Sequence, residues 1–487
     1  GSLGATNNVE AKANAINIIG SVKSNSTQLT ADTDLLLDQN SAVESVENIQ
    51  LNSSNLSVKG KVKAKQLSAQ VQNQLNLEQG SDIQAIELAQ FNAQNINANG
   101  QLTAKAAQLN AKAGANVGAT GSLATIQNTD ISADTIKVDG NLTAQSLNAD
   151  AKSTLNVNQT ANITTASITQ LKANDLIVAG TINTQNAQLN ANNAVNIAQT
   201  ANIGTSDNLN ITANDAVIVG KVKALNATVQ AANALNLEKN AQLQSANLAQ
   251  LNAKDITING QLYTKESKIN AQNKVNLNHG AELVASDGID LKAAQVNLNG
   301  LVNATNANLT SSGTLTVDTN AQLSVVNQAN LNANDLIFNG KSNSKNLNLQ
   351  VNSGLNINAT SDIRAQETAN INAQNIAVNS QILANNTNLT ATQKLDVNQT
   401  GTLLANNNLS LKAQNINISG TSQANTVDIS ASNNLNTAKD SLIISNNNLV
   451  LGAGNKINLN GQTSAVTTNI KSTNDLTTGD SFVAISD

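Results

Sequence analysis

The chain of 487 residues has no cysteine, proline, methionine or tryptophan, and it contains only one tyrosine, three phenylalanines and one histidine. Without cysteine it can form neither a disulfide nor a thiolate metal site. Its core must consist of aliphatic residues and alanine, because the aromatic residues and methionine of ordinary cores are almost absent. No apolar run is long enough to cross a bilayer as a helix. The net charge of −5 and the scarcity of aromatic side chains give nucleic-acid binding little support.

The beginning of the chain lacks two further features. No methionine starts it, and Gly1 and Ser2 resemble the residues that remain when a purification tag is removed. No signal peptide is recognisable either. These observations predict that the sequence is a piece excised from a longer protein. The absence of cysteine suits either the cytosol or a chain that crosses a membrane unfolded.

One ten-residue phrase recurs at multiples of forty residues. LNANDLIFNG at 331 returns as LKANDLIVAG at 171, ITANDAVIVG at 211, LNAKDITING at 251 and LKAQNINISG at 411. Large apolar residues fill two columns of this repeat in every row. The first column is Val43, Ile83, Leu123, Ile163, Ile203, Leu243, Leu283, Leu323, Ile363, Leu403 and Ile443, and the second is Leu51, Phe91, Ile131, Leu171, Ile211, Leu251, Leu291, Leu331, Ile371, Leu411 and Leu451. Two residues after the second column stands Ser53 in the first row and alanine in the others, from Ala93 to Ala453.

Each row of forty residues consists of two related halves. Leu35 and Leu37 in a first half correspond to Leu56 and Val58 in the second, and apolar residues recur at i and i+2 within each half. This is the period of a strand and not of a helix. A unit of about twenty residues with short strands and tight corners fits one coil of a right-handed parallel β-helix. An insertion within a strand would move every later side chain out of register, which explains the constant length.

The sequence therefore predicts an all-β solenoid of about 24 coils of about 20 residues. Residues 1–20 are expected to form an incoming coil, and residues 21–460 the regular β-helix of double coils. Residues 461–487 are expected to form an irregular terminal coil, because the repeat slips by one residue at Asn460 and then fades. Neither end shows a clear polar cap, so we expect the native β-helix to continue beyond this sequence.

Two polar columns mark the predicted corners. The first is occupied mostly by short side chains that bond their own backbone and tolerate left-handed conformations, namely Asn55, Asn95, Thr135, Asp175, Asp215, Asp255, Gln295, Asp335, Asn375, Asn415 and Asn455. The second closes each row on Gly60, Gly100, Gly140, Gly180, Gly220, Gly260, Gly300, Gly340 and Gly420, with Ser380 as the exception. Glycine there predicts either positive φ or a close approach of two backbones.

Two segments carry a family resemblance. NNLSLKAQNINISGTSQA (407–424) and NNLVLGAGNKINLNGQ (447–462) resemble the filamentous-haemagglutinin repeats of large Gram-negative exoproteins exported by two-partner secretion. The resemblance extends over nearly the whole chain. It implies a piece of a long surface β-helix whose activity lies elsewhere, as in adhesins and contact-dependent growth-inhibition toxins. The Asn-Pro motifs of the family's secretion domain cannot occur in a chain without proline, and no toxin-like domain is recognisable after the repeats.

The sequence contains no pattern that indicates a catalytic, cofactor-binding or metal-binding residue. The one arginine, Arg364, stands between Asp362 and Glu367, and we interpret this group as a solvated surface cluster rather than a catalytic one, which would need a cleft. Asp175, Asp215 and Asp255 are expected to stack about 10 Å apart along one corner, too far for a shared metal ion. His279 has no second histidine or cysteine to complete a zinc site or a triad, so we expect an exposed turn residue.

Three further residue groups have two interpretations each. Tyr263 faces outward as an incidental exposed ring or as a ligand contact, whereas Phe91 and Phe338 belong to inward columns. Lys61, Lys63 and Lys65 face outward in KVKAK, and Lys221 and Lys223 do so in KVKAL. These lysines either keep a β-rich protein soluble, which we prefer, or form a basic stripe for acidic glycans.

The leading functional hypothesis is the structural shaft of a secreted exoprotein at the outer-membrane surface of a Gram-negative bacterium, which projects a distal adhesive or toxic region. The alternative is an adhesin module that binds a host or bacterial receptor through an outer face. A polysaccharide-processing enzyme is the third and least favoured hypothesis. The resemblance implies as partners an outer-membrane two-partner-secretion transporter during export and an unknown cell-surface receptor of the full-length protein. We expect a monomeric rod with no cofactor and no enzymatic activity.

Overall fold

A computed structural model describes residues 1–485, and within them the chain is all-β, without a helix, and forms a parallel β-solenoid of about 25 turns. The predicted fold class is confirmed. The strands are β1 (Ser2–Gly4), β2 (Asn8–Ala13), β3 (Ile16–Ile18), β4 (Ser21–Ala31), β5 (Asp34–Leu37), β6 (Ala42–Val58), β7 (Lys61–Leu77), β8 (Asp82–Ala98), β9 (Gln101–Val117), β10 (Ser122–Thr125), β11 (Asn128–Val138), β12 (Asn141–Val157), β13 (Asn162–Val178), β14 (Thr181–Thr184), β15 (Asn186–Ile197), β16 (Asn202–Thr205), β17 (Asn208–Ile218), β18 (Lys221–Leu237), β19 (Gln242–Ile258), β20 (Gln261–Leu277), β21 (Glu282–Ala293), β22 (Gln295–Leu298), β23 (Leu301–Ser311), β24 (Thr314–Val317), β25 (Gln322–Ala333), β26 (Asp335–Phe338), β27 (Lys341–Val351), β28 (Gly354–Ile357), β29 (Asp362–Val378), β30 (Gln381–Val397), β31 (Thr402–Ile418), β32 (Thr421–Thr437), β33 (Leu442–Ala453), β34 (Lys456–Leu459), β35 (Gln462–Ser464), β36 (Thr467–Ser472), β37 (Asp475–Thr478) and β38 (Val483–Ile485).

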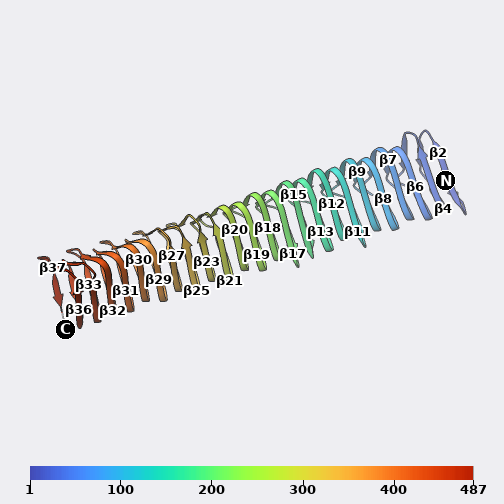
Figure 1. Cartoon of the computed structure of the whole chain (residues 1–487). Helices are drawn as coiled ribbons and strands as arrows, with labels where there is room; N and C mark the ends of the chain where they lie inside the picture. Colours follow the sequence, from blue (N-terminus) through green and yellow to red (C-terminus); the bar gives the residue numbers. More distant parts are fainter. Residues whose placement is uncertain (486–487) are drawn as a thin grey trace. The chain divides into compact units, whose positions relative to one another are not determined.

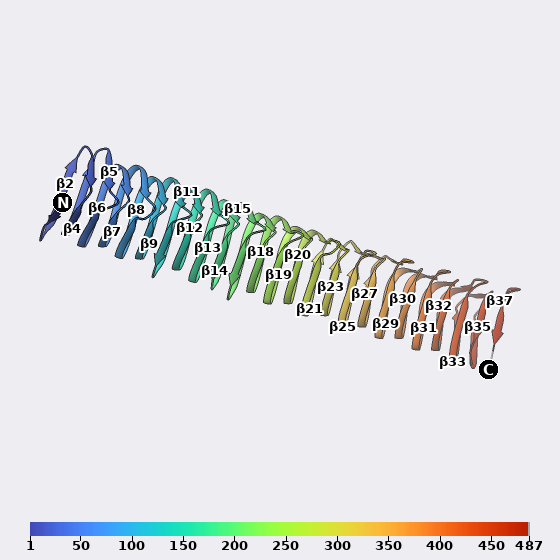
Figure 2. The same ribbon diagram turned by 180° about the vertical axis from the view of Figure 1, so that it is seen from behind.

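The chain divides into two compact units, Gly1–Ala246 and Asn247–Asp487. Within each unit, successive coils stack and their strands pair in parallel (Figure 1), as the view from behind also shows (Figure 2). At the end of the chain, β36 pairs with β33, β37 with β34 and β38 with β35. The last two residues of the predicted terminal coil at 461–487 lie outside the described residues.

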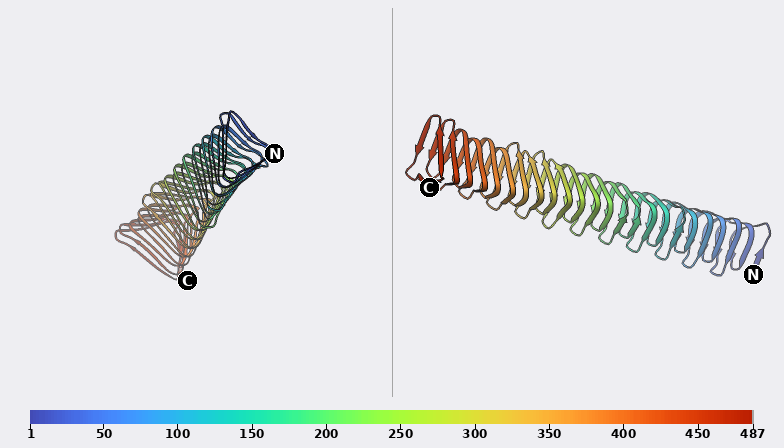
Figure 3. Two further views of the ribbon diagram at one scale, coloured as in Figure 1. Left: turned by 90° about the vertical axis from the view of Figure 1, so that its right-hand side faces the viewer. Right: turned by 90° about the horizontal axis from the view of Figure 1, so that it is seen from below.

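Each coil has three sides (Figure 3). We call them face 1, face 2 and face 3, and in β6 they comprise residues 42–45, 48–53 and 55–58, with the strand register shifting at the corners between them. Along face 1, Ser21 pairs with Ala42, 21 residues later, and Ala42 pairs with Lys61, 19 residues later. The coil length therefore alternates instead of being constant at twenty. Two coils together restore the forty-residue repeat of the sequence.

The inward columns of the sequence form the core. All residues of the first apolar column, from Val43 to Ile443, are at most 2% exposed, and those of the second, from Leu51 to Leu451, at most 1%. Phe91 and Phe338 are buried in the same way. Because each strand pairs with the equivalent strand of the next coil, like side chains stack on like along the solenoid. Burial of each such aliphatic side chain stabilises the fold by about 1.5–3 kcal/mol before ordering costs.

The corners differ from the prediction in their backbone conformation. Among the described residues, positive φ occurs only at Gly80 and Gly280, and no other residue type adopts it. The short polar side chains at the start of face 3 therefore do not use left-handed conformations. Asp335 instead accepts a hydrogen bond from the backbone N–H of Gly354 in the next coil, at 3.0 Å. This bond, together with Ser353 and Asn334, lowers the pKa of the Asp335 carboxyl below its ordinary value.

The glycine column is explained by a close approach of two backbones, the second of the two reasons predicted from the sequence. Gly60 belongs to a two-residue corner that lies against the four-residue turn 38–41 of the preceding coil, where the Ser41 N–H bonds to the Asp38 carbonyl at 2.9 Å. Ser380 stands at the corresponding place in a later row, where it is buried and its hydroxyl donates to the Ser361 carbonyl. Glycine is therefore favoured in this column because there is little room for a side chain, and not because the backbone adopts positive φ.

Candidate functional site

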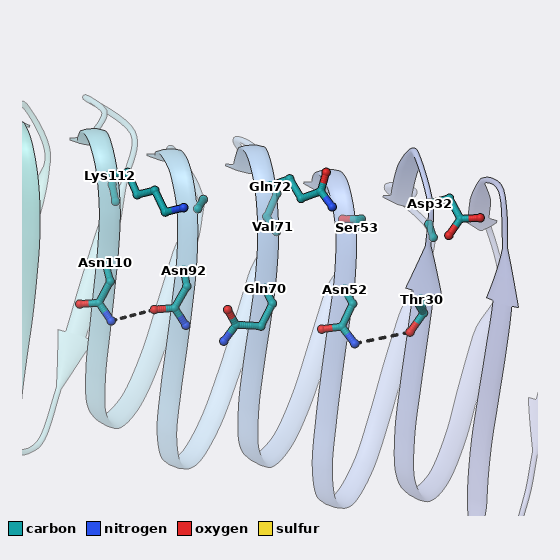
Figure 4. Close-up of a pocket in the computed structure, with 13 residues that line it drawn as sticks. Thr30, Asp32, Asn52, Ser53, Gln70, Val71, Gln72, Asn92, Asn110 and Lys112 are labelled. Atoms are coloured by element: carbon teal, nitrogen blue, oxygen red, sulfur yellow. Dashed lines mark hydrogen bonds between the residues drawn. The ribbon is translucent and has the colours of Figure 1, made fainter.

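A groove of about 640 Å³ crosses five consecutive coils of the first unit, from β4 to β9 (Figure 4). It follows the corner between face 2 and face 3, so its long direction runs across the strands. The lining of the groove has two walls and a floor. One wall consists of Thr30, Asn52, Gln70, Asn92 and Asn110, the floor of Ala31, Ser53, Val71, Ala93 and Ala111, and the other wall includes Asp32, Gln72 and Lys112.

The amide wall is held in place by hydrogen bonds between coils. The Asn110 Nδ2 donates to the Asn92 Oδ1 at 2.9 Å, and the Asn52 Nδ2 donates to the Thr30 Oγ1 at 3.4 Å (Figure 4). In the coil that follows, the Ser132 hydroxyl donates to the Asn110 Oδ1 at 3.0 Å. These residues occupy one outward position of face 2 in successive coils, so the pairing of strands places them side by side. The amide planes of Asn52, Asn92 and Asn110 are consequently oriented before any ligand arrives.

The floor exists because the last inward position of face 2 is small. Alanine at this position leaves the corner hollow, and Val71 is the one large residue among the five floor residues. Ser53 breaks the alanine column that begins in the next row. It is only 6% exposed, and its hydroxyl has no hydrogen-bond partner among the described residues. A buried hydroxyl without a partner is uncommon and costs stability.

The groove is neutral along most of its length. Its two charged lining residues, Asp32 and Lys112, lie at opposite ends (Figure 4). Four coil spacings separate them, or roughly 19 Å, which is too far for the two side chains to act together in a proton transfer. The groove can therefore offer hydrogen-bond donors and acceptors to a ligand, but it contains no pair of titratable groups suited to catalysis.

The cluster around Arg364 is divided between two ion pairs. The Arg364 Nε donates to both carboxylate oxygens of Asp362, at 3.0 and 3.1 Å, and this bond raises the pKa of the guanidinium above its ordinary value. Glu367 instead pairs with Lys345 of the preceding coil at 3.3 Å. The side chains of Arg364 and Glu367 are more than half exposed. The structure therefore places this group on the solvated surface, as the sequence indicated.

The aspartates of the corner column are occupied by their neighbours. Asp175 accepts hydrogen bonds from the Asn193 and Asn174 amides, at 2.6 and 2.9 Å. Asp215 accepts the backbone N–H of Ala234, and Asp255 the amide of Asn273. Among residues 1–485 there is no group of three or more His, Cys, Asp or Glu side chains that could hold a metal ion.

The remaining candidates lie on the surface. His279 is exposed in the turn 278–281, as expected. Tyr263 is only half-buried, and its hydroxyl donates to Glu282 of the next coil, which raises the tyrosine pKa to about 12. Lys61, Lys63, Lys221 and Lys223 are exposed and point outward as expected. Lys65 lies 3.2 Å from Glu47, and this hydrogen bond raises the pKa of its ammonium group.

The groove was not predicted from the sequence, although two signals for it exist. The first is the polar column Thr30, Asn52, Gln70, Asn92 and Asn110. These residues are spaced alternately by 22 and 18, so they do not align in a fixed forty-residue or twenty-residue row. The second signal is Ser53, the single interruption of the alanine column.

Comparison of the chain with protein-family models, curated proteins and solved structures found no match. Within the part of the chain that the structure describes, no helix has the length and apolar character needed to span a membrane. By its fold the chain is a β-helix repeat protein.

Proposed function

We propose that the chain is a structural shaft of a secreted surface exoprotein of a Gram-negative bacterium, which holds a distal adhesive or toxic region away from the producing cell. One observation carries this proposal. Among residues 1–485, no segment between consecutive strands is longer than four residues, as at 38–41. Functional loops on repeat proteins interrupt the repeat, and a coil without insertions is suited to bearing and spacing rather than to recognition.

The resemblance to filamentous-haemagglutinin repeats supports export by two-partner secretion, with an outer-membrane transporter as the partner. The composition is compatible with that route. A chain without cysteine cannot be locked by a disulfide before translocation, and a chain without proline needs no slow prolyl isomerisation afterwards. Each coil can then dock on the coil before it as the chain emerges.

Deletion of whole repeats from the full-length protein tests the shaft. Removal of residues 141–180 joins Gly140 to Thr181 and keeps the coil register. We expect surface display and the activity of the distal region to persist, with the distance from the cell shortened by two coil spacings, about 10 Å. A deletion of residues 141–170 is the matched control, because it breaks the register and should abolish display. If loss of the forty-residue repeat abolished distal activity while display remained, the shaft proposal would be wrong.

The second candidate function is direct binding of a surface ligand through an outer face of the β-helix. The groove between β4 and β9 is the observation that favours it. The same deletion strategy separates the two functions. Removal of residues 61–100, which supply Gln70 and Asn92 to the groove, should abolish binding of the chain to receptor-bearing cells if the chain is itself an adhesin. A shaft would tolerate this deletion as well as the deletion of residues 141–180.

A further inference from the structure

We propose that the groove of the first unit binds a neutral, hydroxyl-rich polysaccharide chain that lies across the strands, along the direction in which the coils stack. This inference rests on the second proposed function, direct ligand binding by an outer face. It extends that function by naming the ligand chemistry and the residues that contact it. Five coils contribute to the groove, so the bound segment spans roughly 19 Å.

The walls suit hydroxyl groups better than ions. Each amide of the wall combines an N–H donor and a carbonyl acceptor, and the ladder bond between Asn110 and Asn92 uses one of each. Asn92 is the acceptor in this bond, so its own N–H groups remain available to a ligand that, like a sugar hydroxyl, both donates and accepts. An anionic polymer would need cations along the groove, yet Lys112 is the one cation in its lining and lies at one end. Asp32 at the opposite end would repel an anionic chain.

The floor closes the groove without adding charge. Its side chains face inward and are at most 8% exposed, and the Ser53 hydroxyl is buried among them. Recognition of a ligand would therefore come from the polar side chains of the two walls.

An extended peptide fits less well. Peptides that bind as strands add to an exposed sheet edge, and pockets for alternate side chains select them. In this groove the strands β6 to β9 run across the long direction and pair with their neighbours on both sides. No free edge runs along the groove. Without aromatic side chains in its lining, each sugar would be held weakly, and affinity would come from several coils acting together.

Affinity electrophoresis of the whole chain tests the proposal. Native gels would contain dextran, mixed-linkage β-glucan or galactomannan, with heparin as the anionic comparison. We expect at least one neutral polysaccharide to retard the chain and heparin not to do so. Asn92→Asp keeps the acceptor for the Asn110 amide but replaces the free N–H groups by negative charge. The dissociation constant obtained from the retardation should therefore rise by about tenfold or more.

Asn76→Asp is the matched control. Asn76 accepts a ladder hydrogen bond from the Asn97 amide at 2.9 Å, as Asn92 does from Asn110, but it lies on face 3 and does not line the groove. It should leave retardation unchanged within about twofold. Retardation by heparin alone, by none of the neutral polysaccharides, or to the same degree in all variants would overturn the inference. Binding of the same chain to receptor-bearing cells, measured in parallel, separates that result from failure of the adhesive function itself.

Discussion

Gly60 lies so close to Ser41 of the preceding coil that a Cβ on Gly60 would come within 2.3 Å of the Ser41 Oγ. The same Cβ would lie 2.4 Å from the carbonyl oxygen of Asp38, which belongs to the backbone of a hydrogen-bonded turn and cannot rotate away. A Cβ on Gly140 would likewise lie 2.4 and 2.3 Å from the carbonyl oxygens of Gly118 and Gly121. Glycine therefore recurs in this column because the backbones of two successive coils, one longer and one shorter, come into close contact there.

Gly60→Ala is expected to destabilise the chain by about 1–3 kcal/mol, because the added methyl group must push two coils apart. Equilibrium urea unfolding, followed by the β-sheet signal in circular dichroism, would measure the change. Gly288→Ala is the matched control, since a Cβ there meets nothing within 4 Å and should shift the midpoint little. Ser380 shows that a coil can adapt to a side chain at this position, so a shift for Gly60→Ala no larger than that of Gly288→Ala would mean that adaptation is general.

The core could be predicted from the sequence because successive side chains of a strand point alternately inward and outward, so an apolar residue at every second position is buried. Leu251 and Ala253 face inward in β19 and are buried, as their columns indicated. The alternating coil length could not be predicted, because it arises from two kinds of corner that add to the same total in each row. The hydrogen-bond partners of the corner side chains could not be predicted either. Asp335 bonds to Gly354, 19 residues away, and only the stacking register decides which residue that partner is.

Ser342 occupies a position that aliphatic residues fill in most coils. It stacks between Leu323 and Ile363, is 2% exposed, and its hydroxyl has no partner among the described residues. Ser342→Val should therefore stabilise the chain by about 1 kcal/mol, because it removes an unpaired hydroxyl and buries additional methyl groups. Thermal and urea unfolding would both report the increase.

Ser311 is the matched control for this substitution. It is buried to the same degree, but its hydroxyl lies 2.9 Å from the Ala294 carbonyl and 3.0 Å from the Thr314 carbonyl. Ser311→Val removes these bonds and should destabilise the chain by about 1 kcal/mol. Changes of the same sign in both variants would show that hydrogen bonding does not govern these two positions.

Leu251 and Lys223 test the assignment of inward and outward faces. Leu251 is fully buried in the second apolar column, whereas Lys223 is exposed on face 1. Leu251→Asp places a charge among stacked aliphatic side chains and should cost more than about 4 kcal/mol. Lys223→Asp remains in water and should change stability by less than about 0.5 kcal/mol. Similar unfolding midpoints for the two variants would contradict the buried position of Leu251.

Tyr263 provides a direct measurement of one contact between coils. Its hydroxyl donates a hydrogen bond to the Glu282 carboxylate, and this bond, followed by burial and the charge of Glu282, raises the tyrosine pKa from an ordinary value of 10.0 to about 12. It is the one tyrosine in a chain without tryptophan, so the absorbance of tyrosinate at 295 nm reports this group alone. Titration of the folded chain should give an apparent pKa near 12.

Removal of the charge should reverse the shift. In Glu282→Gln the tyrosinate no longer faces a carboxylate, so its pKa should fall toward 10. Because the folded pKa is raised, the contact stabilises the fold fully below pH 10, and this contribution disappears as the pH rises from 10 through 12. The difference in stability between the parent chain and Glu282→Gln should therefore be constant from pH 7 to pH 9 and decrease above pH 10. An unshifted tyrosine in the folded parent chain, with circular dichroism unchanged over the titration, would show that Tyr263 and Glu282 are not in contact.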